Sequence, residues 1–375
     1  MTEQPRRILC LSFTDISADA RVLRQLDALA GLAEVTTLGY GGKPATAAEH
    51  LELATNLAPL PGPVRLALRR HDAAEQAAPA VREALRLVGD RRFDLVVANG
   101  VRTMAPAHRV ARGAPVVADL RDWDPEQHTN VRAWRLLVKP FVEHLCVRYL
   151  PKAAGLTVVN DSIGAMYETH FGMRTHTVRN AAEYRELAPR DVADGRIRLV
   201  HSGAAVPGRN VEAIVEAVRG LDERFTLDLY LMPGRDLDRL RRLADREPRV
   251  TLHPPVPADR LADTLNAYDI GVHSLPRLTP NHWLTLPNTF FDFVQARLGV
   301  VFATAPETDR LITEHDLGAI APDASARALR DTLAALSTER VRQCKANASQ
   351  AAKALSSAED AAVTRAVVSR ALSRR

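Results

Sequence analysis

The chain has 375 residues, of which 46% are hydrophobic and 25% are charged, and its formal net charge is +5. At roughly 150 residues per domain this length predicts two globular domains, and the composition excludes a disordered or fibrous chain. The basic residues are dispersed, aromatic residues make up only 5%, and no apolar run has the roughly 20 residues of a membrane span, so we expect neither a nucleic-acid partner nor a transmembrane protein.

Short apolar runs alternate with longer amphipathic stretches along the whole chain. The runs that predict strands in the first half are 8–13, 34–38, 95–98, 116–119, 156–159 and 176–178. In the second half they are 197–201, 226–231, 250–252, 270–273, 300–303 and 318–321. Most of them are apolar on both faces, which is typical of buried parallel strands. Helices are expected at 19–31, 210–220, 236–245, 259–268, 287–295 and 307–314, and within 337–375.

Two successive series of strand and helix predict an α/β protein, with two Rossmann-like, doubly wound parallel-sheet domains facing a cleft. The polar segment 180–196 has no strand pattern, so we place the domain boundary there. The expected parts are an N-terminal domain at 1–185, a C-terminal domain at 186–355, and a helix at 356–375 that can pack back on the first domain. Ligands of such open sheets bind at the carboxyl ends of the strands.

The turn after the first strand of the second domain, VHSGAAVPGRN, is a candidate phosphate-binding loop. Gly203 and Gly208 allow backbone amides to approach a phosphate, and the following helix adds the partial positive charge of its N-terminus. Arg209 can grip a diphosphate through two hydrogen bonds. The alternative is an ordinary strand-to-helix turn with a surface arginine.

The segment NHWLTLPNTFFDFVQARLGVV, at 281–301, is a second candidate. Pro287 suits the first turn of a helix, which places Asn288 and Thr289 close to free amides. Asp292 lies on the next turn, where a carboxylate can accept two hydrogen bonds from a ribose diol. The alternative is a buried helix whose single acid compensates the helix dipole.

This second segment resembles the LPNK-x-F-E-Y-x-x-A-G-x-P-V-V motif of nucleotide-sugar glycosyltransferases with the GT-B fold. The most similar group is the large retaining one that builds capsules, lipopolysaccharide and glycolipids. Other segments are similar to the same family, namely DARVLRQLDALAGLAEVTTLGY, PVVADLRDWDPEQ, AAGLTVVNDSIGAMYETHFG and LHPPVPADRLADTLNAYDIGVHSL. The resemblance spans most of residues 6–325.

The resemblance implies a role for each matching residue. On the donor side, Asp292 would bind the ribose, Arg209 would neutralise the diphosphate leaving group, and the backbone near Val256 would contact the nucleobase. Leu286, Pro287 and Asn288 would lie near the diphosphate and the sugar. Gly203 stays a donor-site candidate because it lies in the phosphate-binding turn described above.

On the acceptor side, Asp15 and Asp19 would face the cleft. Arg121 and Asp122 stand where the family has a His-Asp pair beside the transferred sugar, so they are the candidate catalytic residues.

The sequence also departs from the family pattern. Arg121 replaces the histidine, and Leu284 stands where related enzymes have a second glutamate. The lysine expected one turn after Arg209 is absent from 211–217, and Arg235 can substitute for it. Arg297 replaces a glycine, and Asp292 is one methylene shorter than the usual glutamate.

The resemblance implies transfer of a sugar from a nucleoside diphosphate sugar to a glycan, lipid-linked or small-molecule acceptor, with retention of configuration. Arginine and helix amides can stabilise the diphosphate without a metal. Asp122 and Asp124 have the spacing of a metal motif, but the family has a non-metal motif at this place, so we expect no metal and no cofactor. Two alternatives share the fold: a nucleotide-sugar epimerase, and an inactive subunit that binds a nucleotide or a partner.

Two further features bear on location and chemistry. The amphipathic stretch 134–152 predicts either a domain helix kinked at Pro140 or a peripheral membrane face suited to a lipid-linked acceptor. Without a secretory signal at the N-terminus, we expect a cytoplasmic protein, with the inner face of the membrane as an alternative location. The odd number and spacing of Cys10, Cys146 and Cys344 predict neither a disulfide framework nor a zinc site.

Overall fold

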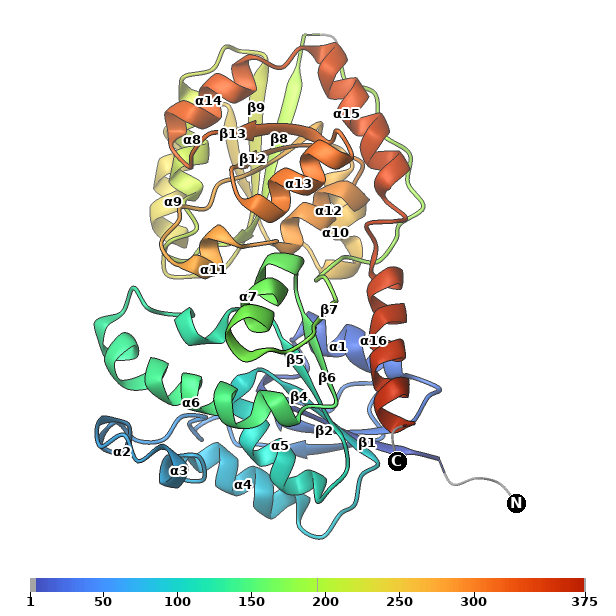
Figure 1. The fold of residues 1–375 in the computed structure, drawn as a ribbon. Helices are drawn as coiled ribbons and strands as arrows, with labels where there is room; N and C mark the ends of the chain where they lie inside the picture. Colours follow the sequence, from blue (N-terminus) through green and yellow to red (C-terminus); the bar gives the residue numbers. More distant parts are fainter. Residues whose placement is uncertain (1–4, 194, 374–375) are drawn as a thin grey trace. The chain divides into compact units, whose positions relative to one another are not determined.

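The computed structural model describes residues 5–193 and 195–373, and the chain divides into two compact units (Figure 1). Unit 1 comprises Met1–Arg179, Thr279–Asn281 and Asp360–Arg375. Unit 2 comprises Asn180–Leu278 and His282–Glu359. The first change of unit falls a few residues before the expected boundary at 185, and a short segment within the second half belongs to unit 1.

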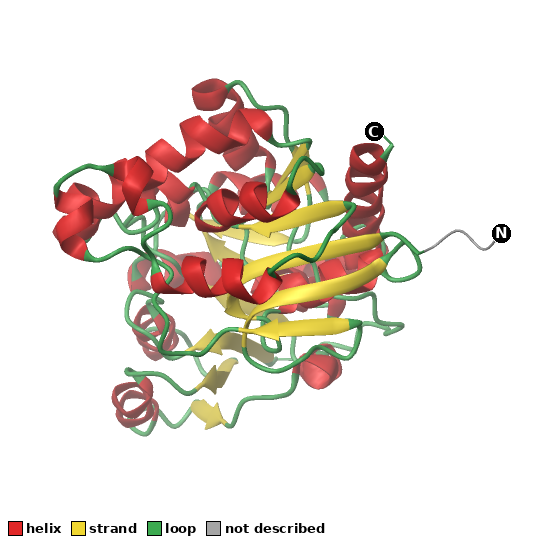
Figure 2. Cartoon of the chain, turned by 90° about the horizontal axis from the view of Figure 1, so that it is seen from below, coloured by secondary structure: helices red, strands yellow, loops and turns green. Residues whose placement is uncertain are grey.

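Unit 1 contains a seven-stranded sheet with the order β3-β2-β1-β4-β5-β6-β7. Its strands are β1 (Arg7–Asp15), β2 (Glu34–Tyr40), β3 (Glu49–Glu52), β4 (Leu95–Asn99), β5 (Val116–Leu120), β6 (Gly155–Val158) and β7 (His176–Thr177). All neighbouring strands run parallel, and Figure 2 shows the sheet with helices on both sides.

The helices of unit 1 connect these strands. They are α1 (Ala20–Leu29), α2 (Pro63–Ala67), α3 (His71–Ala74), α4 (Pro79–Val88), η1 (Val101–Thr103), α5 (Met104–Ala111), η2 (Asp124–Glu126), η3 (Trp134–Val138), α6 (Lys139–Tyr149), η4 (Leu150–Lys152), α7 (Asp161–Phe171) and, from Asp360 onward, α16 (Ser357–Leu372). The stretch 134–152 therefore begins with a π-helical turn, η3. Pro140 has no N–H to donate to that turn, which explains why the regular helix starts only at Lys139.

Unit 2 contains a six-stranded parallel sheet with the order β10-β9-β8-β11-β12-β13. Its strands are β8 (Ile197–Ala204), β9 (Phe225–Met232), β10 (Val250–His253), β11 (Ile270–His273), β12 (Gly299–Ala303) and β13 (Gly318–Ala321). The helices are α8 (Val211–Arg219), α9 (Leu237–Ala244), α10 (Ala258–Leu265), α11 (Pro280–Trp283), whose first residues belong to unit 1, α12 (Asn288–Gln295), α13 (Pro306–Glu314), α14 (Ala326–Ala334) and α15 (Thr338–Ala351).

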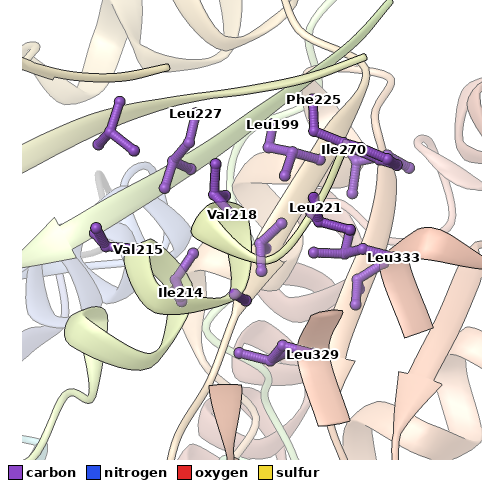
Figure 3. Packing of buried hydrophobic residues seen from close by; sticks show 14 of the residues in the cluster. Leu199, Ile214, Val215, Val218, Leu221, Phe225, Leu227, Ile270, Leu329 and Leu333 are labelled. Carbon is purple, nitrogen blue, oxygen red and sulfur yellow. The ribbon is translucent and has the colours of Figure 1, made fainter. Parts of the chain in front are cut away.

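Apolar positions spaced three and four apart direct the helices onto the sheets. In unit 2, Ile214 and Val218 of α8 meet Leu329 and Leu333 of α14 over the strand residue Leu199 (Figure 3). The three phenylalanines of α12 belong to a second buried cluster. In unit 1, the α16 residues Val367, Val368, Ala371 and Leu372 share a core with β1, so the last helix packs on the N-terminal sheet.

Each expected strand is present, and the order of each sheet is that of a doubly wound fold. This confirms the predicted α/β architecture. The strand β3 was not expected, because its sequence, EHLE, has one buried apolar residue, Leu51, and lies at the sheet edge.

Candidate functional site

The strand order reverses at one place in each sheet, between β1 and β4 in unit 1 and between β8 and β11 in unit 2. Helices leave in opposite directions at such a place, so the carboxyl ends of the two strands are open to a ligand. Most of the candidate residues lie at these two places, and we describe each unit by itself.

In unit 2, β8 extends through Ala204, so Gly203 lies in the last part of the strand and not in the loop that we expected. A side chain at Gly203 would lie 3.3 Å from the imidazole of His201. The loop itself contains Gly208, whose φ is +86°, and the exposed Arg209. Asn210, also with positive φ, precedes α8 and donates to Ser274 Oγ at 2.9 Å and to the Ala324 carbonyl at 2.7 Å.

The N-terminus of α12 lies beside the end of β8. Pro287 is the N-cap residue and Asn288 the first helical one, so Pro287 lies one position earlier than the first turn. The Thr289 hydroxyl donates to the Ser202 carbonyl at 3.4 Å. Ser202 Oγ is buried and has no hydrogen-bond partner among the described residues. The end of β8 is therefore surrounded by the free hydroxyl of Ser202, the free amides of α12 and the loop that contains Arg209.

The other α12 candidates differ in exposure. Leu286 is buried in the phenylalanine cluster, so its side chain supports the helix. Asn288 is exposed and its side chain bonds to that of Asn180. Asp292 is half-buried on the following turn.

Two further donor candidates lie in loops of unit 2. Arg235 is exposed in the turn after β9, and this turn is joined to the β8 loop by a hydrogen bond from Asp236 N to Ala205 O at 3.0 Å. Val256 is half-buried in the loop after β10. Near the end of β10, the ring of Tyr230 stacks on His253 with their centroids 4.7 Å apart. Tyr230 was not among the predicted residues, although it alternates with buried residues along β9.

Two buried histidines stand at the switch point of unit 2. His201 bonds through Nδ1 to the Val272 carbonyl at 2.9 Å, and His273 stacks on Phe302. Burial, reinforced by the nearby charge of Arg209, lowers the pKa of His201 to about 4. Burial also lowers the pKa of His273 to about 3, and both His201 and Arg209 add to this effect. Both imidazoles are therefore neutral near pH 7.

In unit 1, Asp19 and Arg121 form an ion pair of 2.7 Å. Asp19 also caps α1 by accepting from the amides of Arg21 and Val22, and it accepts from Thr14 Oγ1 at 2.7 Å. Burial acts to raise the pKa of Asp19, but Arg121 and these hydrogen bonds lower it overall. Asp15 is exposed and accepts from Ser17. Asp15 and Asp19 therefore hold the β1–α1 turn together and do not line the pocket next to it.

A pocket of about 220 Å³ opens at the carboxyl ends of β1, β4 and β5. Its walls include Arg121 and Asp122, the candidate catalytic residues, and also Asn99 and Arg102, which were not predicted. Asn99 donates to Gln25 Oε1 at 3.1 Å, but its Oδ1 is buried and finds no partner in the part of the chain that the structure describes, and the same holds for Nη2 of Arg121. An acceptor atom and a donor atom are thus both available in one pocket. Asn99 ends a strand that was predicted, and this position is the signal that could have identified it.

The two carboxylates of the Asp-Trp-Asp segment lie in different surroundings. Asp122 accepts from Gln127 Nε2 at 2.8 Å. Asp124 is buried, and burial together with the nearby Asp122 raises its pKa to about 7. The Tyr167 hydroxyl bonds to the Asp122 carbonyl at 2.9 Å and lies 3.3 Å from Asp124 Oδ2. Asp124 therefore carries a proton for part of the time near neutral pH.

A group with metal-binding side chains occurs elsewhere in unit 1, at Asp72, Glu75 and His144. Arg148 donates to Asp72 and lies 3.4 Å from Glu75, and Tyr149 donates to Glu75 at 2.6 Å. A guanidinium thus already supplies positive charge to these carboxylates. All three cysteines are buried and unpaired, and burial raises the pKa of Cys10 to about 12.

Among the described residues, none of the helices combines the length and the apolar character needed to cross a membrane. Comparison of the sequence finds no matching family model and no matching curated protein.

Solved structures do match the chain over nearly its full length. Anabaena HepE in complex with UDP-glucose has a TM-score of 0.69 and 14% identity, over 97% of this chain and 99% of that one. Sucrose-phosphate synthase from Thermosynechococcus elongatus has a TM-score of 0.71 and 14% identity, over 95% and 96%. A glycosyltransferase from Rickettsia africae has a TM-score of 0.69 and 12% identity, over 99% and 100%. The expected GT-B fold is confirmed.

Proposed function

We propose that the protein is a glycosyltransferase that moves a sugar from a nucleoside diphosphate sugar to a glycan, lipid-linked or small-molecule acceptor. The observation that carries this proposal is the hydrogen bond from Thr289 to the Ser202 carbonyl, because it places the free amides of α12 beside the end of β8. The likeness in fold to HepE, which was crystallised with UDP-glucose and with UDP and glucose, supports a nucleotide-sugar donor.

On the donor side, each candidate group of unit 2 contacts a different part of the nucleotide sugar. The α12 amides and the Arg209 guanidinium stabilise the negative charge that develops on the leaving diphosphate. Asp292 accepts hydrogen bonds from the ribose diol, and Arg235 supplies a second cation near the diphosphate. The backbone near Val256 contacts the base, and Tyr230 offers an aromatic surface close by.

The acceptor and transferred-sugar side belongs to the pocket of unit 1. A sugar hydroxyl both donates and accepts, so it can donate to Asn99 Oδ1 and accept from Arg121 Nη2, which both belong to residues of this pocket and find no partner among the described residues. A bound sugar would relieve the cost of leaving both atoms unsatisfied. Arg121 and Asp122 are the proposed catalytic residues, and transfer proceeds with retention and without a metal.

Calorimetric titration tests the donor assignment. We would titrate the purified protein with UDP, GDP, dTDP, CMP, ADP and NAD, in the absence and presence of magnesium. One nucleoside diphosphate should bind selectively and independently of magnesium. Asp292→Ala and Arg209→Ala should each weaken its binding about 10- to 100-fold, since a hydrogen bond to a charged group contributes roughly 1.5–3 kcal/mol.

The matched controls are Asp238→Ala and Arg327→Ala, which remove the same charges from side chains of unit 2 that are 79% and 85% exposed. They should leave the affinity unchanged. Equal affinity of Asp292→Ala and Asp238→Ala would refute the ribose assignment, and binding of NAD alone would refute the family assignment. Sugar nucleotides that carry the selected base would then be assayed for turnover. Binding without turnover by any of them would indicate the inactive nucleotide-binding subunit.

A further inference from the structure

Unit 1 exposes a cluster of aliphatic side chains on two neighbouring segments. Val64 and Leu68, on and just after α2, are 70% and 64% exposed, and Val131 and Leu136, in and just before η3, are 49% and 58% exposed. They are four of the eight exposed large apolar side chains among the described residues. The helices α2 and η3 contact each other, so the two segments that carry the four side chains adjoin, and Figure 1 labels α2 in unit 1.

These two segments contribute little to the core of unit 1. Leu66 is the buried residue of α2, and Val138 is the buried residue of η3. Both helices have five residues, too few to be stable without packing. The four exposed aliphatic side chains therefore lie outside the core of unit 1.

The two segments that carry these side chains contain basic and no acidic residues. Five exposed arginines accompany the aliphatic side chains: Arg65, Arg69, Arg70, Arg132 and Arg135. No acidic residue occurs from 53 to 71 or from 127 to 142. None of the five arginines forms an ion pair with another described residue, whereas the neighbouring Lys139 pairs with Glu126 at 2.7 Å. We call these five arginines and the four aliphatic residues the arginine–leucine surface.

We propose that the arginine–leucine surface docks unit 1 on an anionic phospholipid bilayer. The aliphatic side chains would enter the boundary between headgroups and acyl chains, and the arginines would bind lipid phosphates. Charge complementarity favours this occupant over a second copy of the chain, because a two-fold contact would bring five arginines against five arginines. The exposed apolar groups are aliphatic, so they do not form the aromatic stacking surface of a single-stranded nucleic-acid site.

This inference goes beyond the proposed function and does not depend on it. Should both hold, an acceptor anchored in the membrane becomes the natural substrate class, since the enzyme would be held at the surface from which such an acceptor projects. Binding to vesicles is measured without any sugar nucleotide, so its failure is distinguishable from failure of the donor assignment.

Vesicle sedimentation tests the proposal with the full chain. The protein should bind phosphatidylcholine vesicles that contain about 30 mol% phosphatidylglycerol, and should not bind pure phosphatidylcholine. Binding should fall strongly when the salt concentration rises from about 0.1 M to about 0.5 M, because salt screens the arginine–phosphate attraction. Arg65→Gln/Arg132→Gln should weaken partitioning about 10- to 30-fold, from roughly fivefold for each basic residue at the surface.

The apolar part is tested separately by Leu68→Ser and Leu136→Ser, each expected to weaken partitioning several-fold. The matched controls lie in unit 2: Met232→Ser, at a side chain of similar exposure, and Arg241→Gln/Arg327→Gln. Equal loss in the surface and control variants, or binding that ignores lipid charge and salt, would overturn the proposal. So would concentration-dependent dimerisation that Leu68→Ser abolishes in a protein without affinity for vesicles.

Discussion

The buried ion pair between Arg21 and Asp119 supports our most quantitative prediction. Arg21, on the first turn of α1, donates to both oxygens of Asp119 on β5, at 2.8 and 2.6 Å. It also donates to the Val178 carbonyl at 2.7 Å, and Thr157 donates to Asp119 at 2.6 Å. The two charged side chains are 5% and 2% exposed. The pair therefore fixes α1, and with it Asp19, to the strand that leads to Arg121.

Replacing Arg21 by methionine keeps much of the apolar stem but leaves the carboxylate of Asp119 buried and unpaired. Breaking a buried pair in this way costs about 3–5 kcal/mol, which is a large part of the stability of a typical domain. The measurement is urea denaturation near pH 7, followed by circular dichroism and by tryptophan fluorescence, since Trp123 is buried in unit 1.

Two controls separate this effect from the general cost of substitution. Arg86→Met breaks the exposed pair of Arg86 and Glu83, whose side chains are 69% and 29% exposed, and should destabilise the protein far less than Arg21→Met, because solvent screens an exposed pair. The double variant Arg21→Met/Asp119→Leu should recover much of the loss, because no buried charge remains. If Arg21→Met were no more destabilising than Arg86→Met, the reasoning about burial would be refuted.

The ion pair of Arg21 and Asp119 also predicts how the stability difference between wild type and Arg21→Met depends on pH. Burial acts to raise the pKa of Asp119, but Arg21 outweighs it and the pKa lies below its ordinary value. A depressed acid pKa stabilises the fold above the pKa of the unfolded chain, and the contribution is lost as the pH falls through the folded value. In Arg21→Met the unpaired buried carboxylate takes up a proton at a higher pH than it does in the unfolded chain. The difference in unfolding free energy between wild type and Arg21→Met should therefore shrink as the pH falls from neutral, and should continue to shrink below about pH 4. A constant difference would contradict the assignment of the loss to this charge.

Three further predictions follow from the two switch points. Because the pKa of Asp124 is raised to about 7, unit 1 should lose stability as the pH rises from about 4 to about 7; Asp124→Asn should gain in urea midpoint over wild type between pH 5 and pH 8, and a flat difference would count against the raised pKa. The pKa values of His201 and His273 are lowered to about 4 and about 3, so unit 2 should lose thermal stability as the pH falls from about 6.5 towards 4; His273→Leu should lessen that loss, and equal slopes would disprove the cause. A side chain at Gly234 would lie 2.2 Å from the Ala205 carbonyl, so Gly234→Ala should displace the β8 loop and weaken nucleoside diphosphate binding about tenfold by calorimetry; unchanged affinity would show that the loop shape does not matter.

The strands and the fold class were predictable because parallel strands buried on both faces leave continuous apolar runs. The run at 95–98 is of this kind, and every residue of β4 is buried. The edge strand β3 leaves no such signal, since Leu51 is its one apolar residue and the other three are polar.

The candidate site was predictable only in part. Strand ends and helix starts can be read from local pattern, which is why Arg121, Asp122 and Thr289 were found near the switch points. The ion-pair and hydrogen-bond partners that fix the position and charge of the site residues are distant in sequence. Asp119 lies 98 residues from Arg21, and Asn99 lies 74 residues from Gln25. Periodicity within one segment carries no information on such pairs, so the ion pair of Asp19 with Arg121 could not be foreseen.

Arg297 shows how a departure in sequence can leave a site unchanged. Arg297 is a large cation in place of the glycine of the family pattern, five positions after Asp292. The structure places Arg297 at φ +61°, a conformation suited to glycine, with 1% of its surface exposed. Its guanidinium donates to the carbonyls of Leu187 at 3.1 Å and Gln295 at 2.7 Å, and to that of Arg185. The cation therefore binds the segment that enters unit 2 and terminates α12, away from the first turn of the helix. The strain of the left-handed conformation is offset by hydrogen bonds that a glycine could not make. Because the Arg297 side chain bonds to the linker segment, its presence does not argue against a donor site at Asp292.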